Sequence, residues 1–135
     1  MATAINKTTN KKLITYKRIL ERKSDEVRRS MSVQKAAQVV ARHNEPGDEG
    51  DLSQQSHEEW IFLNRNTIDI TLLRQITDAL HRIELDHYGV CMSCEEPISP
   101  KRLDAVPWAK YCVACQERIA ALPQDEQDEI EAAEV

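Results

Sequence analysis

The sequence predicts a mainly α fold, in which a long antiparallel helical hairpin of the coiled-coil type is attached to a small four-cysteine zinc-finger module with a C-terminal helix. Two observations predict it. Residues 11–43 and 52–88 contain no proline or glycine and carry apolar residues at helical spacing. All four cysteines lie after residue 90, in two pairs of identical spacing. The chain has only six aromatic residues and 30% charged residues, which favours solvated helices and a metal-held module over a large globular core.

The first predicted helix follows a lead over residues 1–10 that we expect to be disordered. Leu13, Tyr16, Leu20 and Val27 recur at steps of three, four and seven residues, which is typical of one face of an amphipathic helix. Such a helix of roughly 30 residues would be about 45 Å long. Proline and glycine in the segment 44–51 end it, because proline cannot continue a helix and glycine lets the backbone reverse.

The second predicted helix runs from about Leu52 to Tyr88, where Gly89 would end it. Its second half has the 3-4-3-4 spacing of a coiled-coil seam, and its first half has an apolar face that drifts from this register. The seam residues are Leu73, Ile76, Leu80, Ile83 and His87, and the upstream residues are Trp60, Leu63, Thr67 and Ile70. A short polar connection between two helices of similar length predicts an antiparallel hairpin over residues 11–88 with its tip at 44–53.

The two halves of the chain carry opposite charge. Residues 1–44 contain eleven Lys and Arg against three acids, whereas residues 45–135 contain seven bases against twenty acids. Opposite signs suit two helices with complementary charges across their seam. The basic half could instead bind nucleic acid, although no aromatic residues alternate with its cations as a stacking surface would require.

The four cysteines organise the predicted module at residues 89–121. Cys91 and Cys94 form one C-x-x-C pair, and Cys112 and Cys115 form another after seventeen intervening residues. This is the ligand set and spacing of one structural zinc ion. A thioredoxin-like pair would leave the second C-x-x-C without a role, and two disulfides would suit a secreted protein. Short turns should surround the metal, and a short helix from about Val113 to Ala121 should carry the last pair.

The remaining segments exclude several function classes. Residues 122–135 form an acidic tail that we interpret as a solvated or frayed helical end. No segment has the length or hydropathy of a membrane span or the apolar core of a signal peptide, so we expect a cytoplasmic protein. No phosphate-binding loop, nucleophile elbow or open metal position is present, and the sequence therefore predicts no enzyme.

Several motifs together resemble the DksA/TraR family of bacterial RNA polymerase regulators. They are D-E-G-D-L-S at 48–53, L-N-R-N at 63–66, H-Y-G-V-C-M-S-C at 87–94, P-I-S-P-K-R-L-D-A-V-P at 97–107 and Y-C-V-A-C at 111–115. The resemblance is close over residues 45–121 and looser over the first helix. It implies a regulator that inserts its coiled-coil tip into the secondary channel of RNA polymerase, rests its zinc module on the rim and alters promoter-complex stability without sequence-specific DNA binding.

The resemblance also implies functional residues at the tip. The family motif D-x-x-D-x-A corresponds to Asp48, Asp51 and Ser53, with serine in place of alanine. The alternative is structural, because Asp51 or Ser53 could cap the second helix, as could a capping box formed by Ser56 and Glu59.

A departure from the family concerns the alarmone ppGpp. Members that respond to this polyanion use basic side chains, whereas the corresponding positions here are Ile68, Gln75, Val106 and Gln116. We therefore expect ppGpp coupling through this site to be weak, although Lys101, Arg102 and Lys110 lie nearby in sequence and could substitute.

Three function classes stay open on the sequence alone. The first is a polymerase-binding transcription regulator, which an intramolecular hairpin would let act as a monomer. The second is a zinc-ribbon nucleic-acid-binding or adaptor protein, which the acidic charge of the cysteine half disfavours because phosphate repels it. The third is a thiol redox switch, which one tightly held zinc ion with unreactive thiols would exclude.

Overall fold

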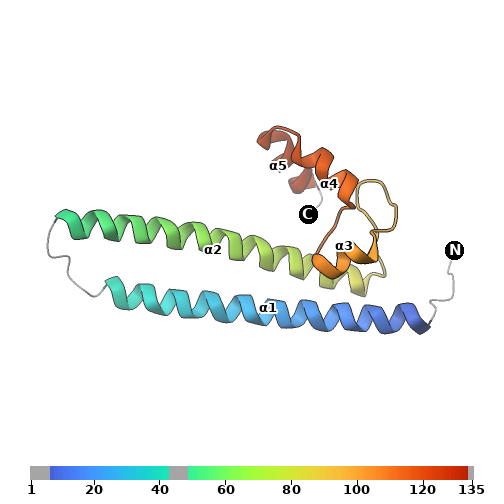
Figure 1. Ribbon diagram of the computed structural model, residues 1–135, viewed down its shortest axis with the longest axis horizontal. Helices are drawn as coiled ribbons and strands as arrows, with labels where there is room; N and C mark the ends of the chain where they lie inside the picture. Colours follow the sequence, from blue (N-terminus) through green and yellow to red (C-terminus); the bar gives the residue numbers. More distant parts are fainter. Residues whose placement is uncertain (1–6, 43–48, 134–135) are drawn as a thin grey trace.

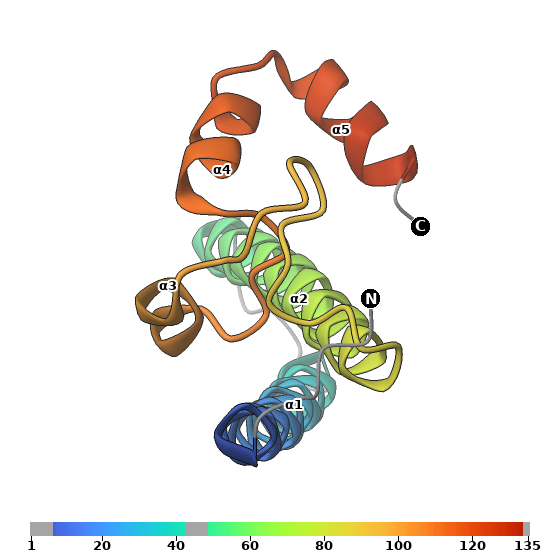
Figure 2. The same cartoon turned by 90° about the vertical axis from the view of Figure 1, so that its right-hand side faces the viewer.

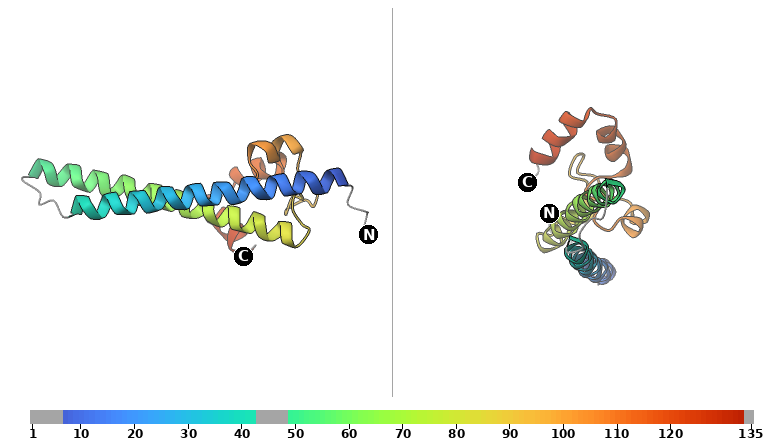
Figure 3. Two further views of the ribbon diagram at one scale, coloured as in Figure 1. Left: turned by 90° about the horizontal axis from the view of Figure 1, so that it is seen from below. Right: turned by 90° about the vertical axis from the view of Figure 1, so that its left-hand side faces the viewer.

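Two long helices form the hairpin. The computed structural model describes residues 7–42 and 49–133. Helix α1 spans Lys7–Arg42 and helix α2 spans Glu49–Glu84, and each contains 36 residues, which corresponds to about 54 Å. They lie antiparallel and side by side, so that the beginning of α1 is next to the end of α2 (Figures 1 and 3). The predicted helical hairpin is therefore confirmed.

The ends of α2 differ from the prediction. The helix begins at Glu49, so Asp51 and Ser53 lie inside its first turns and neither is the residue that precedes the helix. The capping interpretation of these residues is therefore wrong, as is the capping box at Ser56 and Glu59. At the other end the helix stops at Glu84 rather than at Gly89. Asp86 has a φ of 59°, and this left-handed conformation, which aspartate tolerates better than most residues, turns the chain out of the helix.

The hairpin has its core at the end next to the cysteine module. Leu20 of α1 packs there with Ile76, Ala79 and Ile83 of α2, and all four are buried. Half-buried Leu13, Leu72 and Leu80 extend this cluster. The predicted 3-4 spacing is thus used at Ile76 and Ile83, whereas His87 lies beyond the helix and is exposed.

The half of the hairpin toward the tip is more open. Trp60 and Leu63 are 63% and 58% exposed, so at these two residues the predicted apolar face, which drifts from the seam register, does not pack against α1. The Trp60 ring instead stacks on His57 of the same helix at 6.3 Å. A groove of about 620 Å³ runs between the two helices there, with apolar walls that include Met31, Phe62 and Ile70. The seam is therefore sealed at one end only.

Two polar side-chain contacts of the hairpin lie within single helices. Lys23 pairs with Glu26 at 3.3 Å, and His81 faces Glu84 at 3.8 Å. Exposed pairs of this kind contribute little to stability. Apolar packing at Leu20 and Ile76, rather than these pairs, holds α1 against α2.

Three short helices follow the hairpin. They are α3 at Pro100–Ala105, α4 at Val113–Ala120 and α5 at Gln124–Ala133. Figure 2 shows α3 on one side of the end of α2, and α4 and α5 on another. Helix α3 was not predicted, but Ser99 caps it by accepting a hydrogen bond from the Arg102 N–H at 3.2 Å. Pro100 fits because the first position of a helix needs no N–H donor. In the described residues no helix is both long and apolar enough to span a membrane.

Hydrogen bonds from three side chains form a joint between the module and the hairpin. The Tyr16 hydroxyl of α1 donates to Asp104 Oδ1 of α3 at 2.6 Å, and the Tyr88 hydroxyl donates to the Pro107 carbonyl at 2.6 Å. The two tyrosine rings lie 5.7 Å apart. Buried Arg82 of α2 donates to the carbonyl groups of residues 108 and 109, at 3.4 Å each. These contacts set the direction in which the hairpin leaves the module.

Replacing Tyr16 with phenylalanine should weaken this joint, especially below pH 10. Burial, the hydrogen bond to Asp104 and the charge of Asp104 raise the pKa of Tyr16 to about 12. Because the folded-state pKa lies above the ordinary value, the contribution of the hydroxyl is complete below about pH 10 and is lost as the pH rises toward 12. We expect Tyr16→Phe to lower the free energy of unfolding by about 1 kcal/mol at pH 7. Above pH 10, the free energy of unfolding of this variant should fall less than that of the wild type. Urea titrations at pH 7, 10 and 11 measure both effects.

Thr77→Val is the control for this prediction. Its hydroxyl is exposed and bonds only the Leu73 carbonyl of its own helix at 2.8 Å. Equal destabilisation by Thr77→Val and Tyr16→Phe would show that the joint adds no stability.

Candidate metal centre

The first cysteine pair lies in a tight turn. An isolated antiparallel bridge between Val90 and Pro97 closes its base. Within the turn, the Cys91 N–H donates to the Glu96 carbonyl at 2.8 Å and the Glu95 N–H donates to the Cys91 carbonyl at 2.9 Å. Glu95 has a φ of 60°, a left-handed conformation that turns the chain back after Cys94. The local backbone thus brings the Cys91 and Cys94 side chains to one side.

The second pair lies at the start of a helix. Cys112 immediately precedes α4, and Cys115 lies in its first turn. The Gln116 N–H donates to the Cys112 carbonyl at 2.9 Å, and the Met92 N–H donates to the Lys110 carbonyl at 2.9 Å. The latter bond joins the two cysteine segments, and so the two pairs face each other.

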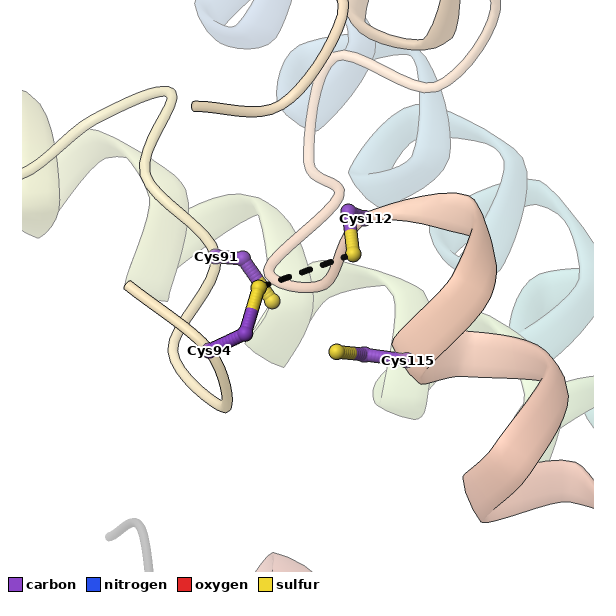
Figure 4. Close-up of side chains that lie close together, drawn as sticks. All are labelled: Cys91, Cys94, Cys112 and Cys115. Carbon is purple, nitrogen blue, oxygen red and sulfur yellow. Dashed lines mark hydrogen bonds between the residues drawn. The ribbon is translucent and has the colours of Figure 1, made fainter. Parts of the chain in front are cut away.

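The four sulfur atoms form one cluster (Figure 4). They all lie within 4.8 Å of one another, and Cys94 Sγ is 3.8 Å from Cys112 Sγ. Zinc–sulfur bonds of about 2.3 Å in a tetrahedron place the sulfurs about 3.8 Å apart. A disulfide would need about 2.05 Å, and all four cysteines are free. The cluster fits a zinc ion and not a pair of disulfides.

The pKa values of the Cys91 and Cys94 thiols are also consistent with a bound cation. Burial raises the pKa of the Cys91 thiol, but the backbone N–H groups of Cys94, Cys112 and Ser93 outweigh it and lower the pKa to about 6. The Glu96 N–H favours the Cys94 thiolate, but burial and hydrogen bonds to the other three sulfurs raise the pKa of Cys94 to about 12. The backbone N–H groups therefore stabilise part of the negative charge of the thiolates, and a divalent cation would balance the rest.

An apolar shell surrounds the cysteines. Buried Cys91 and Cys115 pack with Ile98, Leu103 and Tyr111, whereas Cys94 is exposed. Trp108 packs against the hairpin cluster around Leu20 and Ile76. Tyr111 therefore fills the module core, and Trp108 connects the module to the hairpin.

Two of the three predicted tip residues, Asp51 and Ser53, lie in the first turns of α2, at the opposite end of the hairpin from the cysteines. Asp48 lies outside the described residues. Asp51 is the third residue of α2, and Ser53 is exposed two residues later. The structure therefore brings the four predicted metal ligands together and places Asp51 and Ser53 at the other end of α2 (Figure 1).

Three of the four positions discussed for ppGpp line one cavity. Gln75, Val106 and Gln116 border a space of about 170 Å³ between α2, the segment after α3 and α4. Ile68 lies elsewhere on α2 and is exposed. Arg82, Arg102 and Lys110 line the same cavity together with Asp78.

Two cations in or next to the cysteine module were missed by sequence reasoning. Arg82 forms part of the joint, and no sequence pattern marked it. Arg118 donates from Nη2 to Cys115 Sγ at 2.9 Å, and it lowers the pKa of the Cys115 thiol. Its spacing of three residues from Cys115 on one helix is a signal that could have identified it.

Comparisons with known proteins identify the module. Residues 87–119 match the family described as the prokaryotic dksA/traR C4-type zinc finger. A protein of Aquifex aeolicus described as uncharacterized is 34% identical over 82% of this chain and 78% of its own length. The Salmonella typhimurium RNA polymerase-binding transcription factor DksA is 29% identical over 75% of this chain and 66% of its own length. The Haemophilus influenzae protein of the same name is 30% identical over 51% of this chain and 48% of its own length. The match therefore spans about half to two thirds of the length of these two DksA relatives.

Solved structures share the fold. The transcription factor DksA2 from Pseudomonas aeruginosa superposes with a TM-score of 0.72 over 96% of this chain and 92% of its own, at 23% identity. A Chlamydia trachomatis structure described as an RNA polymerase binding protein and transcriptional regulator Dks gives 0.52 over 83% and 91%, at 22% identity. With the sulfur geometry, the finger match assigns one structural zinc ion to the four cysteines. Residues 87–119 thus form a zinc finger of the dksA/traR C4 type, and the chain as a whole has the fold of DksA2.

Proposed function

We propose that this protein is a transcription regulator that binds bacterial RNA polymerase directly. The observation that carries the proposal is the arrangement of the chain: a hairpin of two 36-residue helices begins at a zinc module and ends in an acidic tip. Relatives named for binding RNA polymerase match its sequence, and DksA2 has the same fold. These relatives support the choice of partner, and the length of the hairpin supports the mechanism that we propose.

The hairpin acts by reaching into the polymerase through its secondary channel. A helix pair of about 54 Å is long enough to approach a deeply recessed site while the wider module stays on the rim. Asp48 and Asp51 would then lie near the catalytic region, where carboxylates can bind basic side chains or perturb a metal-bound site. Ser53 follows on the exposed surface of the same helix.

Exposed apolar residues near the tip supply contact area for this partner. Trp60, Ile61 and Leu63 are all exposed on α2, and exposed aromatic and aliphatic residues commonly mark protein interfaces. The groove beside Phe62 and Ile70 adds a recess between the helices. This surface is consistent with a protein partner along the half of the hairpin toward the tip.

The effect on transcription needs no catalysis by this protein and no sequence-specific DNA binding. A closed tetrathiolate site leaves no open metal position for a substrate. Residues 45–135 carry twenty acids against seven bases, and such a surface repels phosphate. We propose that the protein acts as a cytoplasmic monomer that changes the stability of promoter complexes through polymerase alone.

A binding experiment with purified core RNA polymerase tests the proposal. Immobilised protein should retain the polymerase without DNA and should not retain a DNA fragment without polymerase. A variant with Trp60 and Leu63 replaced by serine should bind polymerase at least about tenfold more weakly, since each buried apolar contact contributes roughly 1.5–3 kcal/mol. Retention of DNA alone, with no retention of polymerase, would favour a nucleic-acid-binding protein instead.

We expect ppGpp to change the activity of this protein only weakly. Gln75, Val106 and Gln116 replace basic residues around the cavity, Asp78 adds a negative charge to it, and Arg82 bonds the carbonyl groups of residues 108 and 109. Promoter-complex lifetimes measured across a ppGpp titration, with and without the protein, should show less than about a threefold combined effect, because few strong phosphate contacts are available. A large combined effect that Arg102→Ala and Lys110→Ala abolish would show that these two residues replace the missing cations.

A further inference from the structure

A zinc ion held by four thiolates carries a net charge of −2, which the surrounding protein must stabilise. Backbone N–H groups donate hydrogen bonds to the sulfurs of the first cysteine pair. The N–H groups of Cys94, Cys112 and Ser93 act on the Cys91 sulfur, and the Glu96 N–H acts on the Cys94 sulfur. Donors of this kind carry only partial charge, and so they reduce the net charge of the centre very little.

Cys115 has a different kind of partner. The guanidinium of Arg118 donates to its sulfur at 2.9 Å, and the side chain of Ser93 also donates to it. Both Cys115 and Arg118 belong to α4, three residues apart and hence on one helix face. Cys115 is 2% exposed and Arg118 is exposed, so an exposed side chain supplies the hydrogen bond to a buried cysteine.

Other cations near the module have different contacts. Arg82 donates to the carbonyl groups of residues 108 and 109, and the Lys110 ammonium lies over the Tyr111 ring, 5.3 Å from its centroid. Arg118, in contrast, donates directly to the sulfur of a predicted zinc ligand.

We propose that Arg118 is a positioning residue of the zinc centre, which holds the Cys115 thiolate on the metal by a charged hydrogen bond and slows loss of zinc through that ligand. Zinc leaves a tetrathiolate site when one sulfur is protonated, alkylated or oxidised. A guanidinium beside the sulfur lowers the net charge of the centre from −2 to −1 and occupies a sulfur lone pair, so it opposes attack by electrophiles at that position. This role does not depend on the proposed function.

Zinc transfer to a coloured chelator tests the proposal. Polar partners of metal ligands typically contribute 10–100-fold in metal affinity, so we expect Arg118→Gln to release zinc about tenfold faster at neutral pH. Arg118→Met, which keeps the apolar cover but removes charge and donor, should behave like Arg118→Gln. Arg118→Lys should restore part of the difference. Lys101→Gln removes one positive charge from an exposed position of the same module and should match the wild type.

Alkylation mapping gives a second readout that a general loss of structure would not reproduce. With limiting iodoacetamide, the wild type should react first at exposed Cys94, whereas Arg118→Gln should react first at Cys115, with unchanged helix content by circular dichroism. Equal zinc release by Arg118→Gln and wild type, with an unchanged order of alkylation, would overturn the proposal. Wild-type release by Arg118→Met, or faster release by Lys101→Gln equal to that of Arg118→Gln, would also overturn it.

Discussion

A variant in which Asp48 and Asp51 are both replaced with asparagine should bind core RNA polymerase as the wild type does and should no longer shorten the lifetime of promoter complexes. The substitutions keep the shape of the side chains but remove the two negative charges that we propose to lie near the catalytic region of the polymerase. Asp51 lies in the first turn of α2, where a carboxylate stabilises the helix by about 0.3–1 kcal/mol. That loss is small compared with the packing of two 36-residue helices against each other. Polymerase affinity and the dissociation half-life of promoter complexes are measured separately.

The double variant Glu58→Gln/Glu59→Gln is the matched control. Both glutamates are exposed on α2, close to the tip, and their replacement removes the same amount of charge. This control should retain the effect on promoter complexes. If Asp48→Asn/Asp51→Asn instead loses polymerase binding and helix content together, the tip has a structural role. If both variants lose activity equally, the total charge of α2 matters and the tip motif does not.

Replacing Cys115 with serine should abolish zinc binding and unfold the module while the hairpin stays helical. Structural zinc contributes about 10–16 kcal/mol of binding free energy at neutral pH, comparable to or larger than the whole stability of a typical domain. The module has a small core around Ile98, Leu103 and Tyr111, which is too little to fold alone. Elemental analysis should give one zinc per wild-type chain and none in the variant.

The extent of unfolding distinguishes the two parts of the chain. Circular dichroism should lose the signal of α3 and α4, which contain six and eight residues, and should keep most of that of α1 and α2. Ala114→Ser places a hydroxyl group at an exposed position next to Cys115 and should keep both zinc and structure. A Cys115→Ser chain that holds one zinc and a folded module would contradict the four-ligand assignment.

Local patterns in the sequence account for the parts of the structure that were predicted. The absence of proline and glycine predicts α1 and most of α2, because backbone continuity and apolar periodicity are properties of neighbouring residues. The two C-x-x-C pairs predict the sulfur cluster for the same reason, since each pair needs only one turn. Ile76 and Ile83 confirm that the 3-4 spacing marks the packed part of the seam.

Local exceptions explain the errors at helix ends. Gly89 has a φ of 83°, as a glycine after a helix often has, but Asp86 adopts a left-handed conformation earlier and ends α2 first. Pro100 and its neighbouring prolines indicated turns, whereas Ser99 provides the cap and Pro100 occupies the one position where proline favours a helix.

Contacts between distant segments could not be read from one sequence. Tyr16 and Asp104 are 88 residues apart. Nothing in the sequence around either residue indicates that the Tyr16 hydroxyl donates to the Asp104 carboxylate. Trp108 packs on the hairpin instead of on the cysteine module because the joint brings its segment against α2. Trp60 is exposed although its spacing is helical, since the seam is sealed only at the end next to the module.

A cross-linking measurement tests the central claim, that the hairpin enters the polymerase with its tip foremost. A photoreactive side chain at exposed Ser53, near the start of α2, is compared with the same group at exposed Thr77, near the other end. Mass spectrometry of the cross-linked peptides should place the residue-53 products on polymerase segments that line the secondary channel near the catalytic centre, and any residue-77 products at the outer rim. Residue-53 products confined to the outer surface, or no products despite tight binding, would contradict the proposal.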